Sequence, residues 1–249
     1  MLEVFEKGYD MHSYVAWLIY PDKIPRDVDI RDIKEKYHSL RQDAKGPEFT
    51  FAFLGNWATL VGNYGMPKEE AIQIEDNYKK GFAGATKYQE ECKKYTEATG
   101  IIRVCRETGH ISRWWDWKKW YARQHSKEFW DNYRERKEAG LPRSTEADEH
   151  FAARNKYDKN SVNSTTQGLG AVIFKEFTYA LYIWILDKGY QNKVKFCVPV
   201  HDEICEECPK ELTQEVVKAT KHFMETIGAK YCHKLPLPAE EEIGPFWKH

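Results

Sequence analysis

The sequence VPVHDEICEE, residues 198–207, places three side chains capable of metal or phosphate chemistry at one reverse turn. His201, Asp202 and Glu203 separate two short strand-like segments, where tight hairpins usually place Asn-Gly or Asp-Gly. A carboxylate on a rigid turn is held at a fixed position, which suits Mg²⁺ because that ion requires near-octahedral oxygen geometry. The alternative is a polar turn without a catalytic role, and the tripeptide taken alone favours it.

A second group of candidate residues recurs every four positions in RQDAKGPEFTFAF, residues 41–53. Arg41, Lys45, Phe49 and Phe53 shift by only about 40° per step around a helix, so they could share one face. Two cations followed by two rings could hold a triphosphate at one end and stack a base at the other. The alternative is a solvated cationic face beside core phenylalanines, and this stretch taken alone favours it.

The pair Gly46-Pro47 interrupts that pattern. Proline lacks the N–H that a helix interior needs and restricts the residue before it. The sequence therefore predicts either a kinked helix or a helix that restarts at Pro47. In the second case Lys45 lies beside a helix N-terminus, which itself favours phosphate.

The elements that must position these residues follow from the hydrophobic pattern, and their order predicts an α+β fold. Ser164 and Gln167 could form a capping box at the start of a long buried helix that ends near Gly189. A hairpin and a helix that stops at Gly228 follow it. In chain order we expect helices over 1–20, 29–45, 66–82 and 84–98, strands over 193–200 and 203–208, and a helix over 210–227.

Residues 101–160 differ in character from the rest of the chain. Five of the nine tryptophans lie between positions 114 and 130, and Lys and Arg outnumber Asp and Glu across the segment. Interleaved aromatic and basic residues suit stacking and phosphate contacts on nucleic acid. A small helical subdomain with its own aromatic core explains the same composition, and the two interpretations are compatible.

The composition indicates a soluble chain without a membrane span. Charged residues make up 31% of it, the net charge is -1, and the mean hydropathy is -0.74. The cysteines do not form a disulfide framework of the secreted type. A zinc site at Cys205, Cys208, Cys232 and His233 is a minor alternative, because this spacing is incomplete for a common zinc module.

Four motifs in this order resemble the C-terminal part of a family A DNA polymerase. They are DMH at 10–12, R-x3-K-x7-F at 41–53, N-x3-Q-G at 163–168 and VHDE at 200–203. The phage members are the most similar in style, and the resemblance covers nearly the whole chain. It implies fingers helices plus part of an antiparallel palm sheet, incomplete without the upstream palm and the thumb.

The resemblance implies a nucleotide site on the fingers helix. Arg41, Lys45 and His12 match residues that bind the triphosphate of the incoming dNTP, and Lys45 also counts among the catalytic residues. Phe49 matches the aromatic position beside the sugar and base. Phe53 occupies a position usually held by tyrosine, which stacks near the templating base.

The resemblance also implies a DNA and metal site. Asn163 and Gln167 match residues that contact the primer-template near the new pair, and His201 matches a primer-end contact. Asp202 matches the catalytic metal ligand, and Glu203 matches a supporting acid. The family uses two Mg²⁺ ions to clamp the attacking and leaving oxygens.

The sequence departs from the family in several places. Leu54 stands where glycine is usual, Pro199 lies in a predicted strand, and residues 105–155 look enlarged. More seriously, no D-Y-S-x-x-E-like segment with a second metal-binding aspartate lies upstream of Asp10. With one aspartate, this sequence supplies only half of the carboxylates that hold the two metal ions against the nucleotide phosphates.

These departures predict one piece of a split polymerase. The first residues look like the interior of a helix, which favours the same interpretation. We expect a fingers part (1–100), an aromatic and basic insertion (101–160) and a palm portion (161–249). We also expect a second polypeptide carrying the missing carboxylate, the upstream palm and the thumb, with or without an exonuclease domain. The expected location is the cytoplasm of a phage-infected bacterium, without a membrane; the alternative function is that of a non-catalytic nucleic-acid-binding fragment.

Overall fold

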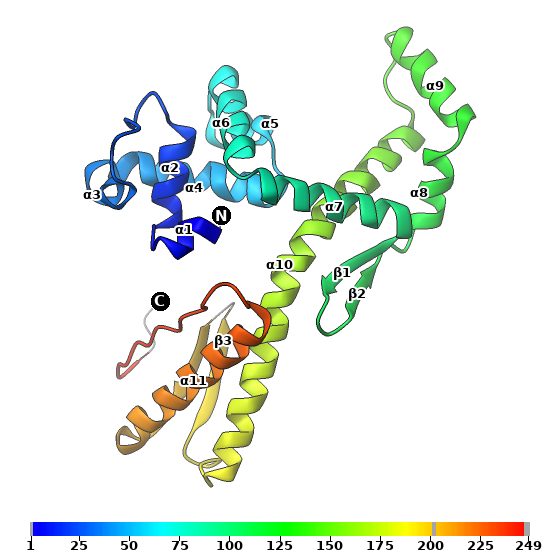
Figure 1. Cartoon of the computed structure of the whole chain (residues 1–249). Helices are drawn as coiled ribbons and strands as arrows, with labels where there is room; N and C mark the ends of the chain where they lie inside the picture. The colour runs from blue at the N-terminus through cyan, green and yellow to red at the C-terminus, as the bar shows by residue number, and fades with distance from the viewer. Residues whose placement is uncertain (1, 201–202, 247–249) are drawn as a thin grey trace. The chain divides into compact units, whose positions relative to one another are not determined.

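The computed structural model describes residues 2–200 and 203–246. The fold is mainly helical with two small antiparallel hairpins, which confirms the predicted α+β class (Figure 1). The chain divides into two compact units, one up to Thr165 and one from Thr166. In chain order the elements are α1 (Leu2–Glu6), α2 (Met11–Ile19), η1 (Ile30–Asp32), α3 (Ile33–Lys36), α4 (His38–Ala52), α5 (Trp57–Tyr64), α6 (Lys68–Gly81), α7 (Ala83–Thr99), β1 (Ile101–Cys105), β2 (His110–Arg113), α8 (Trp117–Gln124), α9 (Lys127–Glu138), α10 (Thr145–Asp187), β3 (Lys195–Val200), β4 (Glu203–Glu207), η2 (Lys210–Leu212) and α11 (Thr213–Tyr231).

The first helices pack around one apolar core. Val15, Ala16 and Ile19 of α2 are buried with Ala44 and Phe51 of α4, and the core extends to α5 and α6. The single helix predicted over 1–20 is wrong in one respect, because the structure has two helices there, α1 and α2, separated by a short turn. The break lies at Gly8, whose φ of 65° is left-handed, and α2 restarts with Asp10 as its N-cap.

Helix α4 runs without interruption through Pro47, so the predicted restart at this residue is wrong. Proline in a helix interior costs about 3 kcal/mol, and the burial of Pro47 in the core offsets part of that cost. The preceding Gly46 lies against the exposed side chain of Tyr64, whose ring would be 2.8 Å from an added Cβ and would have to move. Helix α4 therefore presents Arg41 and Lys45 on the same continuous element as Phe49.

The end of α4 explains the unusual Leu54. This residue has φ 60° and is the one non-glycine residue with positive φ in the described part of the chain. The N–H of Gly55 donates to the carbonyl of Thr50 at 2.6 Å, and the N–H of Leu54 donates to that of Phe51 at 3.3 Å. These two bonds form a Schellman motif, in which glycine is usual at the left-handed position. The glycine expected from the resemblance would be the less strained residue at this position.

Helices α6 and α7 follow the predicted pattern closely. Ala71, Ile74 and Tyr78 of α6 are buried as expected, whereas Ile72 is 36% exposed and does not join that face. Burial raises the pKa of Tyr78 to about 12. Helix α7 ends at Gly100, whose φ of 68° confirms the predicted stop.

The tryptophan-rich segment has its own core. Trp114 and Trp120 are buried with Ile102 and Tyr157, and the rings of Trp114 and Tyr157 stack at 4.3 Å. The structure thus confirms an aromatic core, built on the β1–β2 hairpin as well as on helices. Trp115 is the exception, with 85% of its surface exposed.

Helix α10 is continuous from Thr145 to Asp187, so the capping box predicted at Ser164 and Gln167 is wrong. The predicted burial is also only partial, since Tyr179 is 67% exposed. By length and composition alone, α10 is the one helix of the described chain that could cross a membrane. This is a weak indication, because long helices of soluble proteins pass the same test.

The unit from Thr166 onward packs β3, β4 and α11 against the C-terminal half of α10 (Figure 1). Phe177, Leu181 and Ile185 of α10 are buried there with Val194 and Val216. The inward face predicted for the last helix is confirmed, but the predicted stop at Gly228 is wrong. Helix α11 continues to Tyr231, and Gly228 instead admits Leu237, whose Cβ would lie 3.1 Å from an added Cβ.

Candidate functional site

Arg41 of α4 is held by a two-point ion pair with Asp10. Its Nε donates to Asp10 Oδ2 at 2.8 Å, and its Nη2 donates to Oδ1 at 2.9 Å. The same carboxylate accepts from the N–H and the hydroxyl of Ser13, so it caps α2 while it orients the guanidinium. The hydrogen bonds from Arg41 and Ser13 hold the pKa of Asp10 well below its usual range.

His12 lies on the first turn of α2 and faces α4. Its Nδ1 is 2.6 Å from Glu48 Oε2, and its ring meets the ring of Phe49 edge-on at 6.1 Å. The Phe49 side chain remains 52% exposed. The sequence motif DMH therefore brings an aspartate to Arg41 and a histidine to Glu48, on one face of α4.

The other two residues of the predicted face occupy different settings. Lys45 lies in the helix and is half-buried, and the ion pairs of the described residues include none that it forms. Phe53 is the C-cap residue of α4 and lies just beyond the helix. Arg41, Lys45 and Phe49 thus share the helix, while Phe53 follows its end.

Asn163 and Gln167 lie four residues apart on α10, so their side chains share one helical face. Asn163 is half-buried, and its Oδ1 has no hydrogen-bond partner within the described structure. Gln167 is exposed. Of the two side chains, Gln167 is therefore the one open to a ligand on this face.

The predicted metal-binding hairpin is present as strands β3 and β4. Val200 pairs with Glu203 at the end of the ladder, and Pro199 lies opposite Ile204. His201 and Asp202 lie outside the described residues, so their predicted roles stay predictions. The described sheet has only these two strands, and each leaves one edge unpaired, which is where proline is tolerated.

The described side chains do not by themselves form a metal site. No group of three or more His, Cys, Asp or Glu side chains in the described ranges is arranged to hold an ion. This includes Cys205, Cys208, Cys232 and His233, so the zinc alternative has no support in the structure. For Mg²⁺, the described part of the hairpin offers the carboxylate of Glu203, and the ion usually takes one or two carboxylates together with water and phosphate oxygens.

Sequence reasoning missed the roles of Asp10 and Glu48. Both acids are far in sequence from the groups that they hold: Asp10 contacts Arg41, and Glu48 contacts His12. A signal was available for Asp10, because aspartate directly before the apolar run of α2 is typical of an N-cap. Nothing in the local sequence pairs it with a residue of another helix.

Helix α4 carries two cations and an exposed ring, which suits a nucleotide-binding protein. Comparison with known proteins points to the same class of protein. The family model described as DNA polymerase family A matches residues 1–249. The chain therefore belongs to DNA polymerase family A, which confirms the resemblance drawn from the motifs.

Individual relatives are similar at moderate identity. DNA polymerase I of Streptococcus pneumoniae is 26% identical over 247 residues, which cover 99% of this chain and 23% of that protein. The DNA polymerase of Bacillus phage SP01 is 32% identical over 95 residues, 36% of this chain and 10% of the phage protein. DNA polymerase I of Aquifex aeolicus is 26% identical over 256 residues, 99% of this chain and 35% of the relative.

A solved structure shows the same fold. The POL domain of Pol1 from M. smegmatis, in complex with DNA primer-template and dNTP, superposes with a TM-score of 0.69 at 19% identity. The match covers 95% of this chain and 34% of that chain. This chain therefore spans about a quarter to a third of the length of the full-length relatives and the solved structure that it matches along its whole length.

Proposed function

We propose that this chain is the C-terminal part of a template-directed DNA polymerase that adds dNTPs to a primer 3′ end together with a second polypeptide. The observation that carries the proposal is the pairing of the DMH segment with α4. Asp10 holds Arg41, and Glu48 holds His12 against α4, where the His12 ring meets the ring of Phe49. Membership of family A supports it further.

In this proposal one face of α4 binds the incoming dNTP. Asp10 occupies two N–H groups of Arg41 and leaves the others to donate to phosphate oxygens. Lys45 adds a point charge, and His12 reaches the same phosphates. Phe49 lies beside the sugar and base, and Phe53 stacks near the templating base.

The primer-template is contacted from α10 and the hairpin. Asn163 and Gln167 contact the primer-template near the new pair from α10, where Gln167 is the exposed residue of the two. His201 holds the primer end. These roles rest on the match of each residue to the family's motif and not on a bound strand.

Asp202 is the proposed metal ligand of this chain, with Glu203 in support. Family A polymerases generally use divalent metals. Two bound Mg²⁺ ions would neutralise charge that develops on the phosphates. The second carboxylate is proposed to come from a partner that carries the upstream palm and the thumb, because the D-Y-S-x-x-E-like segment expected from the family is not found in this sequence. The similarity to bacterial and phage polymerases favours the cytoplasm as the place of action.

A primer-extension assay tests the proposal. The chain is incubated with labelled primer-template, dNTPs and Mg²⁺, with and without the polypeptide that supplies the missing aspartate motif. Extension is expected only in the presence of both, and Asp202→Ala should abolish it while DNA binding persists. If both components are folded and no extension occurs, or if Asp202→Ala extends normally, the polymerase proposal is wrong and the non-catalytic alternative gains support.

A further inference from the structure

Two cysteines lie next to each other on neighbouring strands of the β3–β4 hairpin. In this ladder Phe196 lies opposite Glu206, and Val198 lies opposite Cys205. The register shifts between the two pairs, so Cys197 is the extra residue of a β-bulge. Because two residues of β3 then share one partner on β4, Cys197 is a neighbour of Cys205 across the strands. We call these two cysteines the bulge pair.

The side chains around the bulge pair show which face of the hairpin the two thiols occupy. Phe196 and Ile204 pack against the core formed with α10 and α11, and Glu206 turns the same way, toward a hydroxyl of α11. Side chains alternate along a strand, so Cys205 lies on the face opposite to that of Ile204 and Glu206. Cys197 is exposed and Cys205 is half-buried, in agreement with an outward position for both.

The spacing of the bulge pair suits a covalent bond between the two sulfur atoms. Residues opposite each other in an antiparallel ladder have Cα atoms about 4.5–5.5 Å apart, and a disulfide spans about 4.4–6.8 Å between Cα atoms. Burial raises the pKa of the Cys205 thiol, and the charge of Cys197 raises it further. The two thiols are thus within electrostatic range of each other, as the register requires. Both are free in this structure.

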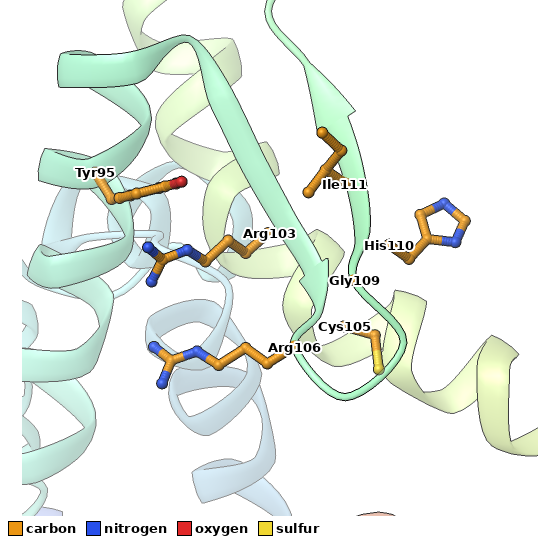
Figure 2. Close-up of a pocket in the computed structure, with 7 residues that line it drawn as sticks. All are labelled: Tyr95, Arg103, Cys105, Arg106, Gly109, His110 and Ile111. Atoms are coloured by element: carbon orange, nitrogen blue, oxygen red, sulfur yellow. The ribbon is translucent and has the colours of Figure 1, made fainter.

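The other cysteines occupy different settings. Cys208 packs against the core of the same unit, and its thiol lies 3.8 Å from a hydroxyl of α11. Figure 2 shows Cys105 at the end of β1, with no second cysteine among the side chains that line the pocket there. The Cys105 thiol donates to Glu107 at 3.4 Å. Cys92 belongs to α7, and Cys232 is the C-cap residue of α11. The strand register therefore singles out the bulge pair.

From this geometry we propose that Cys197 and Cys205 form a redox modification site, which closes to a disulfide across the hairpin when a low-molecular-weight disulfide is the oxidant. The exposed Cys197 thiolate attacks one sulfur of the oxidant, a mixed disulfide forms, and one thiolate leaves. The Cys205 thiolate then attacks the Cys197 sulfur, and the second thiolate leaves. Two protein thiols are oxidised, the external disulfide is reduced to two thiols, and the two protein thiol protons end on the leaving groups.

The place of the bulge pair in the chain gives the modification a consequence. Cys197 belongs to β3 and Cys205 to β4, and the segment between them includes Asp202, the candidate metal ligand. A bond between the two strands closes this segment into a short loop and reduces the number of conformations open to it. The site itself rests on the strand register and does not depend on the proposed polymerase activity.

The test incubates the full chain with glutathione disulfide, blocks the remaining thiols with N-ethylmaleimide and counts the blocked thiols by intact mass after denaturation. Of the six cysteines, two should escape the block, and dithiothreitol added before the block should restore all six. A protease that cleaves after glutamate cuts between the bulge pair at Glu203, and between Cys205 and Cys208 at Glu206. The digest should therefore contain one product in which a disulfide joins the peptides of Cys197 and Cys205.

Three single variants separate the two steps of the reaction. Cys205→Ser should stop at the mixed disulfide, so that one glutathione stays attached to Cys197. Cys197→Ser should form no internal disulfide and should take up less glutathione, because the remaining thiol is half-buried. Cys208→Ser is the matched control, since it removes the next thiol along the chain, and it should form the internal disulfide at the wild-type yield. If Cys205→Ser does not fold, Cys205→Ala carries the same test.

The proposal is overturned if the wild type keeps six blockable thiols, or if it stops at a mixed disulfide as Cys205→Ser does. It is also overturned if the digest links Cys205 to Cys208, or if the disulfide joins two separate chains. Primer extension plays no part in these readouts. A failed extension assay would count against the polymerase proposal and leave the thiol counts unchanged.

Discussion

The pairing of Asp10 with Arg41 makes a prediction that can be measured on the isolated chain. Asp10→Asn keeps an acceptor for the α2 N-cap but removes the charge that faces the guanidinium. A charge-assisted hydrogen bond contributes about 1.5–3 kcal/mol when it is buried. The Asp10 side chain is 36% exposed while that of Arg41 is only 11% exposed, so screening by water reduces the loss to about 1 kcal/mol.

The comparison with Asp10→Ala separates the ion pair from the cap. Alanine removes both functions, and loss of an N-cap costs roughly a further 1 kcal/mol. For a chain of this size each 1 kcal/mol lowers Tm by about 2–4 °C. Thermal unfolding followed by circular dichroism should therefore rank wild type above Asp10→Asn, and Asp10→Asn above Asp10→Ala, in two similar steps.

The pH dependence gives an independent check. Arg41 and Ser13 hold the pKa of Asp10 below its unfolded value of about 3.9. A depressed carboxyl pKa contributes stability that is fully present above the unfolded pKa and is lost as the pH falls through the folded one. The gap between wild type and Asp10→Asn should be constant near neutrality and close in acid. If Asp10→Asn melts with the wild type at neutral pH, the ion pair does not stabilise the chain and the reasoning fails.

Two other predictions concern the backbone and a buried acid. Gly55→Ala should destabilise the chain by several kcal/mol in chemical denaturation, because its Cβ would lie 2.7 Å from the Thr50 carbonyl oxygen. Gly62→Ala is the matched control, since no atom lies within 4 Å of the new Cβ. It should stabilise the chain by roughly 0.5–1 kcal/mol. Equal effects of the two changes would contradict this account. Burial raises the pKa of Glu206, so its ionised form costs stability at neutral pH. Glu206→Gln keeps an acceptor for the Thr220 hydroxyl and should therefore raise Tm at neutral pH. This gain in Tm should vanish as the pH falls to the pKa of the glutamate in the unfolded chain. A gain in Tm that persists in acid would show another cause.

The sequence predicted those parts of the fold that local patterns determine. The left-handed Gly100 ends α7 as expected, and the strands around residues 195–207 form a hairpin. The errors occurred where tertiary packing outweighs a local signal. Pro47 lies inside α4 with its side chain buried, and Ser164 lies in the middle of α10 instead of at the start of a helix.

The candidate site was predicted in part for a similar reason. The four-residue repeat placed Arg41, Lys45 and Phe49 on one helix, which the structure bears out. It could not show that Asp10 pairs with Arg41, because an ion pair across 31 positions leaves no periodic trace. Nor could composition divide the aromatic residues into core and surface, since Trp114 and Trp115 are neighbours with opposite burial.

The Asp10 contact changes how charge is distributed over the proposed dNTP site. A guanidinium that is 11% exposed needs a counter-charge, and the Asp10 carboxylate supplies it before any nucleotide arrives. Arg41 then offers oriented N–H groups but little net charge to a triphosphate. Lys45, for which the described ion pairs include no acid, is the cation that retains its full charge on this face. Arg41 is thus better suited to fix the geometry of the phosphates, and Lys45 is better suited to attract and neutralise them.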